Sequence, residues 1–277
     1  MENDWLKTSF EGWTFHHSAP LTPTTRPILA LHGFTGSGCD FRQLSEHPEA
    51  PADTCWIAPD LPGHGDTGVL PRAECSLNAM ADVLSRFLES QKLEPHLLGY
   101  SMGGRLALTL ATQGAPIASL TLIGAHPGII DESERQQRRC ADHELALHIR
   151  EIGSVAFAEE WELKPLIRSQ CSIPQPYLDG LKTRRRRQSA EGLARCLEEA
   201  GTGTMAPLWD SLKSIQYPIL YLFGAEDIKF RAIGHSLAAV CKKFKSGELP
   251  NAGHCAHLEN SLEFLTKLKR CITTPIT

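Results

Sequence analysis

The sequence predicts an α/β domain in which helices cover both faces of a mostly parallel central sheet. Two observations support this class. Short apolar runs bounded by glycine, proline or aspartate alternate with segments of helical spacing through the first half of the chain, and such alternation is typical of sheets built from βαβ units. Apolar residues make up 42% of the 277 residues, which is enough to bury a substantial core.

Five apolar runs indicate the buried strands. They lie at residues 27–33, 55–63, 96–101, 119–128 and 217–227. Helical spacing predicts helices over residues 76–91 and 102–114, and the segment 12–18 near the start predicts an antiparallel edge strand.

The pattern changes between about residue 129 and residue 208, where helical segments with few β-branched residues follow one another. These segments lie at 131–153, 154–167, 175–188 and 190–201, and Asp131 and Ser133 are candidate N-caps of the first. We therefore expect a helical cap, residues 129–208, inserted into a core domain made of residues 1–128 and 209–277.

Composition and charge exclude several classes of protein. The net charge is −4, from 28 basic and 32 acidic residues, and this balance disfavours nucleic acid and anionic membranes as partners. The chain has no run of 18 apolar residues and no apolar signal segment at its start. We therefore expect a cytoplasmic protein that works as a monomer or a small homo-oligomer.

The sequence indicates neither a metal nor any other cofactor. Nine cysteines are scattered along the chain without a CxxC pair, a spacing that fits neither a disulfide framework nor a zinc site. A P-loop motif is also absent from the sequence. The thiols are therefore expected to be reduced.

One short motif points to chemistry. The segment 99–103, GYSMG, places Ser101 between a predicted strand and a predicted helix, which is the context of a nucleophile elbow. Glycine at positions 99 and 103 lets backbone segments approach closely at the turn, and the N-terminus of the following helix favours negative charge beside the serine. Taken alone, the motif also fits an ordinary strand-to-helix turn.

Three further features favour a catalytic serine. Phe34, after an early strand, and Met102, after the serine, are placed to donate the two backbone N–H groups of an oxyanion hole. Asp227 follows the last long strand, and His254 lies 27 residues further on. The order Ser, Asp, His is that of the α/β-hydrolase fold.

Two neighbouring residues compete for these roles. Glu226 is the alternative acid to Asp227, and His257 is the alternative base to His254. The place of Asp227 directly after the turn and the AGH pattern of residues 252–254 favour the first member of each pair.

Longer segments resemble the 2-succinyl-6-hydroxy-2,4-cyclohexadiene-1-carboxylate (SHCHC) synthases of menaquinone biosynthesis, a family of α/β-hydrolase-fold lyases. The resemblance covers the chain from about residue 28 to residue 260. GYSMGGRLAL, GTGTMAPLW and the Lys-Phe pair after the predicted acid are its most characteristic segments, whereas LHGFTGSGCDF, DLPGHGDT and AGHCAHLEN are generic to the superfamily.

The resemblance implies a reaction. Members of this family eliminate pyruvate from 2-succinyl-5-enolpyruvyl-6-hydroxy-3-cyclohexene-1-carboxylate, a small precursor with three carboxylates. Ser101, His254 and Asp227 are then expected to act as a proton-abstracting base rather than to form an acyl-enzyme.

A polyanionic substrate needs fixed cations. Arg105 lies one helical turn after Ser101 and hence near the pocket. The resemblance adds Arg138 and one arginine of the run 184–187, of which Arg185 is the favoured member. Arginine suits this task because its planar fork binds a carboxylate bidentately, although a run of arginines is more often a solvated helix face.

Two aromatic residues complete the implied substrate site. Tyr100, beside the predicted nucleophile, and Trp161, in the insertion, match pocket positions of the family. For Trp161, a plain core role is the alternative.

Two other functions compete with this interpretation. A hydrolase of esters, thioesters or carbon–carbon bonds would use the same triad through a covalent intermediate, but we would expect an apolar cap for it. A binding protein on a hydrolase scaffold usually lacks a triad member, whereas all three positions are filled here.

Overall fold

The structure is a computed structural model that describes residues 5–22 and 25–273. The strands of this described part are β1 (Leu6–Phe10), β2 (Trp13–His17), β3 (Arg26–Leu31), β4 (Thr54–Pro59), β5 (His96–Tyr100), β6 (Ser119–Ile123), β7 (Ile219–Gly224) and β8 (Phe244–Leu249). They form one sheet in the order β1-β2-β4-β3-β5-β6-β7-β8. The strands from β3 to β8 run parallel, and β2 pairs antiparallel with both β1 and β4.

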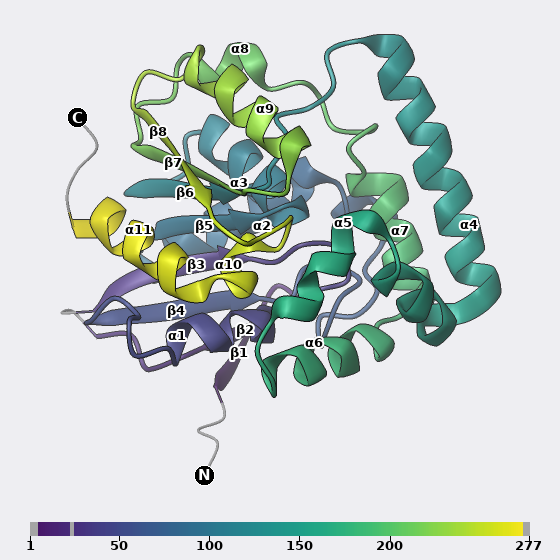
Figure 1. Cartoon of the computed structure of the whole chain (residues 1–277), viewed down its shortest axis with the longest axis horizontal. Helices are drawn as coiled ribbons and strands as arrows, with labels where there is room; N and C mark the ends of the chain where they lie inside the picture. Colours follow the sequence, from purple (N-terminus) through teal and green to yellow (C-terminus); the bar gives the residue numbers. More distant parts are fainter. Residues whose placement is uncertain (1–4, 23–24, 274–277) are drawn as a thin grey trace.

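Helices surround this sheet (Figure 1). The α-helices are α1 (Arg42–Ser45), α2 (Leu77–Gln91), α3 (Met102–Thr112), α4 (Glu132–Glu162), α5 (Pro165–Arg168), α6 (Tyr177–Arg186), α7 (Ala190–Ala200), α8 (Trp209–Leu212), α9 (Ile228–Ala238), α10 (Ala256–Glu259) and α11 (Ser261–Thr273). The described residues also form three short 3₁₀ turns, η1 (Gly38–Phe41), η2 (Arg72–Glu74) and η3 (Ser169–Ser172).

Alternation along the strands explains why both faces of the sheet are covered. Successive side chains of a strand point to opposite faces. In β3, Leu29 and Leu31 therefore enter one core, with residues of α2 and α3, while Ile28 and Ala30 enter the other, with residues of α1 and α11. A strand that is apolar on both faces is typical of a parallel sheet between two helical layers.

The predicted fold class is confirmed, with some differences at the sheet edges. The five expected strands are present as β3 to β7, and each ends earlier than predicted because its last predicted residues belong to the loops at the carboxyl edge. The segment 12–18 forms the antiparallel β2, but β1 pairs along its outer side, so the prediction of an edge strand was wrong. No sequence pattern predicts β1 and β8, because their residues are largely polar and partly exposed.

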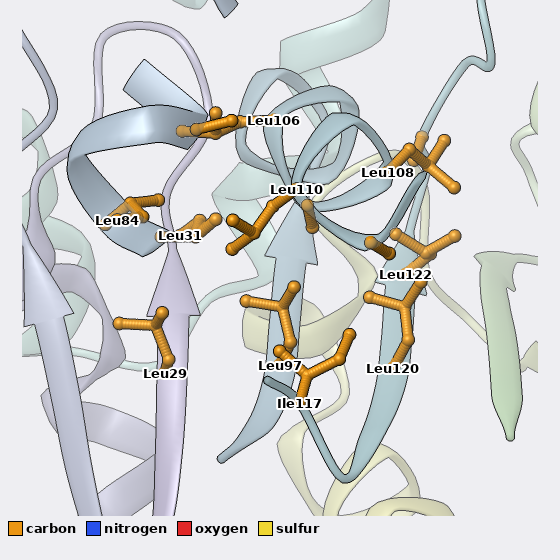
Figure 2. Packing of buried hydrophobic residues seen from close by; sticks show 14 of the residues in the cluster. Leu29, Leu31, Leu84, Leu97, Leu106, Leu108, Leu110, Ile117, Leu120 and Leu122 are labelled. Carbon is orange, nitrogen blue, oxygen red and sulfur yellow. The ribbon is translucent and has the colours of Figure 1, made fainter. Parts of the chain in front are cut away.

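Leucines form much of the core beneath α3. Figure 2 shows Leu106 and Leu110 of α3 over the strands that carry Leu97 and Leu120, and all four side chains are fully buried. Burial of one such side chain contributes about 1.5–3 kcal/mol. The layer thus holds α3, and the residue before it, in a defined place on the sheet.

The helices α4 to α7 follow β6 and gather on one side of the molecule, at the right of Figure 1. Asp131 caps α4 by accepting a hydrogen bond from the Glu134 backbone N–H at 2.8 Å, whereas Ser133 lies inside the helix. Gly153 interrupts α4 with a φ of 78°, a conformation that glycine adopts without a steric penalty. No helix in the described part is long and apolar enough to span a membrane.

We expect Leu97→Ala to lower the free energy of unfolding by about 2–5 kcal/mol, because the substitution leaves a cavity in a close-packed core. Urea denaturation followed by circular dichroism measures the change. Leu147→Ala on α4 is the matched control, because Leu147 is 51% exposed and should change stability by no more than about 0.5 kcal/mol. Equal effects of the two substitutions would contradict this account of the core.

Candidate active site

The carboxyl edge of the parallel sheet brings three polar residues together. Ser101 follows β5, Asp227 follows β7, and His254 comes after β8. The Oγ of Ser101 lies 3.0 Å from Nε2 of His254, and Nδ1 of the same ring lies 2.7 Å from Oδ2 of Asp227. Hydroxyl, imidazole and carboxylate thus form one hydrogen-bonded chain, which is the geometry of an activated serine.

Ser101 occupies a strained turn. Its φ of 51° and ψ of −107° lie outside the regions that residues with a side chain usually adopt. A Cβ on Gly103 would lie 2.1 Å from the carbonyl O of Leu31, and one on Gly99 would lie 2.6 Å from the carbonyl O of Gly103. The backbone N–H of Ser101 donates to the carbonyl of Ile123 at 2.8 Å. Close packing and this hydrogen bond together hold the strained backbone.

Contacts around the imidazole and the carboxylate orient both groups. The ring centroid of His254 lies 4.6 Å from that of Phe230, and a Cβ on Gly124 would lie 2.7 Å from the ring. Asp227 caps α9, since its Oδ1 accepts from the Phe230 backbone N–H at 3.3 Å. This bond leaves Oδ2 directed at His254.

The competing acid and base lie elsewhere. Glu226 is exposed. His257 is buried against Tyr100, with ring centroids 4.5 Å apart, and burial lowers the pKa of His257 to about 3. Asp227 and His254 are the members of the two pairs that the structure joins to the serine.

Phe34 and Met102, the expected oxyanion donors, both line the same cavity as Ser101. Phe34 lies in the loop after β3 and Met102 is the first residue of α3. The backbone N–H groups at the start of a helix have no partner within the helix, which suits Met102 to the role.

Two buried histidines hold the loop that carries Phe34. Nε2 of His32 accepts from the backbone N–H of Leu61 at 3.0 Å, and Nε2 of His64 accepts from that of Thr35 at 3.3 Å. Burial lowers the pKa of His64 to about 3, so its ring stays neutral and keeps an acceptor nitrogen. These residues therefore position the loop and leave the base role to another histidine.

A cavity of about 190 Å³ lies beside the nucleophile. The sheet side contributes Ser101, Arg105 and Lys229, and the helices after β6 contribute Arg138 and Trp161. The cavity is thus formed between the core and the proposed cap, a common position for a small-molecule site.

Two expected arginines line this cavity. Arg105 is buried, and its Nη1 donates to the carbonyl of Ala200 in α7; burial lowers its pKa to about 10, which still leaves it charged at neutral pH. Nε of Arg138 donates to Oδ1 of Asp142 at 2.8 Å. Because a guanidinium has five N–H donors, both retain donors for an anion.

A third cation, Lys229, also lines the cavity and is not among the residues predicted for the site. Its Nζ lies 5.7 Å from the ring centroid of Phe230. His126 lines the same cavity, and burial together with the charges of Lys229, Arg105 and Arg138 lowers its pKa to about 4. The positive charges of these three side chains therefore all act on His126. In the sequence, the Lys-Phe pair after the predicted acid was the signal that could have identified Lys229 as a site residue.

Trp161 lines the cavity, as expected. Its ring centroid lies 5.4 Å from those of Phe34 and Phe157. Its buried indole N–H has no hydrogen-bond acceptor in the described part of the chain, so it is available to a polar group of a bound molecule.

Tyr100 and Arg185, both expected at the substrate, line a separate cavity of about 30 Å³. Nη2 of Arg185 donates to Oε1 of Gln170 at 2.8 Å, and Nη1 lies 3.5 Å from Oε1 of Glu162. Burial raises the pKa of the Tyr100 phenol well above its usual value. Phe34 lines both cavities.

Among the described residues, one group of side chains has the composition of a metal site: His16, Asp60 and Asp66, whose ligand atoms lie within 4.8 Å of one another. None of the three lines the cavity beside the nucleophile. Asp66 pairs with Lys7 at 2.6 Å, and His16 hydrogen-bonds Asp60 at 2.9 Å. Since partners within the protein already occupy these groups, we assign no metal to them.

Comparison with known families agrees with this geometry. The model of the alpha/beta hydrolase family matches residues 28–267. A relative from Salmonella typhimurium, named 2-succinyl-6-hydroxy-2,4-cyclohexadiene-1-carboxylate synthase, is 32% identical over 246 residues, which are 87% of this chain and 91% of that protein.

Solved structures are similar over nearly the whole chain. MenH from S. aureus superposes with a TM-score of 0.84 at 32% identity, covering 92% of this chain and 96% of that one. A thermophilic esterase from Thermogutta terrifontis, at 22% identity and a TM-score of 0.77 over 99% of this chain and 98% of its own, shares the fold. The chain therefore belongs to the alpha/beta hydrolase family and, within it, to the 2-succinyl-6-hydroxy-2,4-cyclohexadiene-1-carboxylate synthases.

Proposed function

We propose that this enzyme eliminates pyruvate from 2-succinyl-5-enolpyruvyl-6-hydroxy-3-cyclohexene-1-carboxylate, with Ser101, His254 and Asp227 as its proton-abstracting base. One observation carries the proposal: the hydrogen-bonded triad opens into a cavity lined by three cationic side chains. A substrate with three carboxylates needs such a lining, whereas a hydrolase of apolar esters does not.

The first step is a proton transfer. Nε2 of His254, 3.0 Å from Oγ of Ser101, takes the hydroxyl proton while the serine oxygen removes a proton from a ring carbon of the substrate. Asp227 stabilises the imidazolium that forms, through its 2.7 Å bond to Nδ1. A general base positioned in this way typically accelerates proton abstraction by about 10²–10⁴-fold.

The second step breaks a carbon–oxygen bond. The electron pair of the broken C2–H bond forms a C2–C3 double bond, the electron pair of the existing C3–C4 double bond moves to C4–C5, and the C5–O bond breaks. The enolpyruvyl group leaves as the enolate of pyruvate, which then takes up a proton on carbon. The backbone N–H groups of Phe34 and Met102 would stabilise the enolate-like charge that develops during proton removal.

The three cations would bind the carboxylates. Arg105 and Lys229 reach the cavity from α3 and α9, and Arg138 reaches it from α4. The free indole N–H of Trp161 adds a donor without charge. Burial of Arg105 strengthens its interaction with a carboxylate, because the effective dielectric constant is lower there than in water.

Ser101→Ala should lower the rate of enzymatic pyruvate release by about 10²–10⁴-fold, because it removes the group that abstracts the proton. The assay supplies freshly generated precursor, follows pyruvate with a coupled dehydrogenase, and subtracts the rate without enzyme. Ser236→Ala is the matched control, since Ser236 is exposed on α9 and should leave the rate unchanged. Wild-type turnover by Ser101→Ala would refute the proposed base.

Lys229→Ala should lower kcat/KM by about 10–100-fold, mainly through KM, because a hydrogen bond to a charged group contributes about 1.5–3 kcal/mol. Steady-state kinetics with the same precursor measures the effect. Lys242→Ala, at an exposed lysine outside the cavity, serves as the control. If the two variants have the same KM, Lys229 has no part in carboxylate binding.

A further inference from the structure

A second hydrogen-bonded chain of polar side chains lies outside the cavity. Sγ of Cys39, in η1, is 3.6 Å from Nδ1 of His16, in β2. Nε2 of His16 is in turn 2.9 Å from Oδ2 of Asp60, which follows β4. The order of nucleophile, imidazole and carboxylate is one that activates a nucleophile, and none of these residues lines the cavity of Ser101.

His16 lies between two acceptors and is held in its charged form. His16 and Asp60 are 2% and 1% exposed. Burial by itself lowers the pKa of His16, but the hydrogen bonds to Asp60 and Cys39 outweigh burial and raise that pKa to about 9. Despite burial, the hydrogen bond from His16 lowers the pKa of Asp60 to about 2. An imidazolium donates from both ring nitrogens, so it can serve the carboxylate and the sulfur together.

Other charged groups face the same sulfur. Lys7 and Arg184 both interact electrostatically with Cys39. Lys7 also pairs with Asp66 at 2.6 Å, and Arg184 pairs with Asp40 at 2.7 Å. The cations around the thiol therefore come from β1, β2 and α6, and a nearby cation stabilises the thiolate form of a cysteine.

The sulfur is also placed where a small molecule can reach it. Cys39 is partly exposed and lines a groove of about 690 Å³. Gln43 of α1 contributes to the core side of this groove, and Tyr177 and Arg184 of α6 contribute to the other side. The groove thus lies between the core and the proposed cap.

The other eight cysteines lack this combination. Cys140 and Cys171 are exposed, and the structure gives Cys140 an amide partner, Gln136, at 3.6 Å. The six remaining thiols are buried: Cys55, Cys75, Cys196, Cys241, Cys255 and Cys271. Among the described cysteines, Cys39 alone joins partial exposure to an imidazole–carboxylate pair.

We propose that Cys39 is a modification site for low-molecular-weight disulfides of the glutathione type, and that the groove between α1 and α6 receives the attached half. The Cys39 thiolate attacks one sulfur of the disulfide, a new S–S bond forms, and the original S–S bond breaks. The other half leaves as a thiolate that takes up the proton lost by Cys39, so the disulfide is the sole oxidant required.

The test treats the full chain with oxidised glutathione at pH 6.5 and locates the adducts by peptide mass spectrometry over time. An ordinary thiol is only about 1% thiolate at this pH. We expect Cys39 to be modified at least tenfold faster than Cys140 and Cys171, although both of these are more exposed. Equal rates at the three cysteines would overturn the proposal.

Two variants separate this site from the active site. His16→Asn should slow modification of Cys39 to the rate of Cys140 and leave Cys140 unaffected. Cys39→Ser should abolish the fast adduct and keep the wild-type rate of pyruvate release, because Cys39 is no part of the cavity beside Ser101. The outcome at Cys39 is thus independent of whether the proposed elimination is correct.

If His16→Asn does not fold, the pH profile of the unmodified chain provides the same test. The rate at Cys39 should depend less steeply on pH between pH 8 and pH 6 than the rate at Cys140, because the charged ring of His16 lies beside the sulfur throughout this range. Equal pH dependence at the two cysteines would rule out an activated thiol.

Discussion

The close approach of α3 to β3 is the constraint on which the rest of the site depends. Gly103 lies so near the backbone of Leu31 that any side chain there would collide with it, and the leucines beneath α3 keep the two elements together. This packing holds Ser101 at a φ of 51°, a strain of about 1–3 kcal/mol that burial of one or two core leucines offsets. The strained turn is what directs the hydroxyl at His254 and not into the helix.

Chemistry and binding come from different parts of the chain. The sheet supplies the triad, and the helices after β6 add Arg138 and Trp161 to the cavity. The hydrogen bond from Arg105 to the carbonyl of Ala200 ties the two parts together at the cavity wall. Burial, together with the positive charge gathered there, lowers the pKa of His126. An anion that enters this cavity therefore finds charges already in place, which lowers the reorganisation needed for reaction.

Short sequence patterns predict the features of this structure that depend on residues adjacent in sequence. They fail for side chains whose position is determined by tertiary packing. The elbow around Ser101 and the loop positions of Asp227 and His254 follow from short motifs. Tyr100 is next to the nucleophile in sequence, yet it packs into the core on the other face of the sheet, because successive strand residues point in opposite directions. Arg185 does face inward, but Gln170 and Glu162 engage it there. Lys229 reaches the cavity because Asp227 caps α9 and sets its first turn.

The two nucleophile chains of this molecule differ in what their histidines can do. A serine hydroxyl is not ionised at neutral pH and needs a base, so His254 must be free to accept a proton. His16 is held as an imidazolium by Asp60 and the sulfur, and an imidazolium cannot accept another proton. It can stabilise a thiolate, which is reactive without a base. Proton abstraction from a carbon is therefore the chemistry suited to Ser101, and exchange at sulfur is the chemistry suited to Cys39.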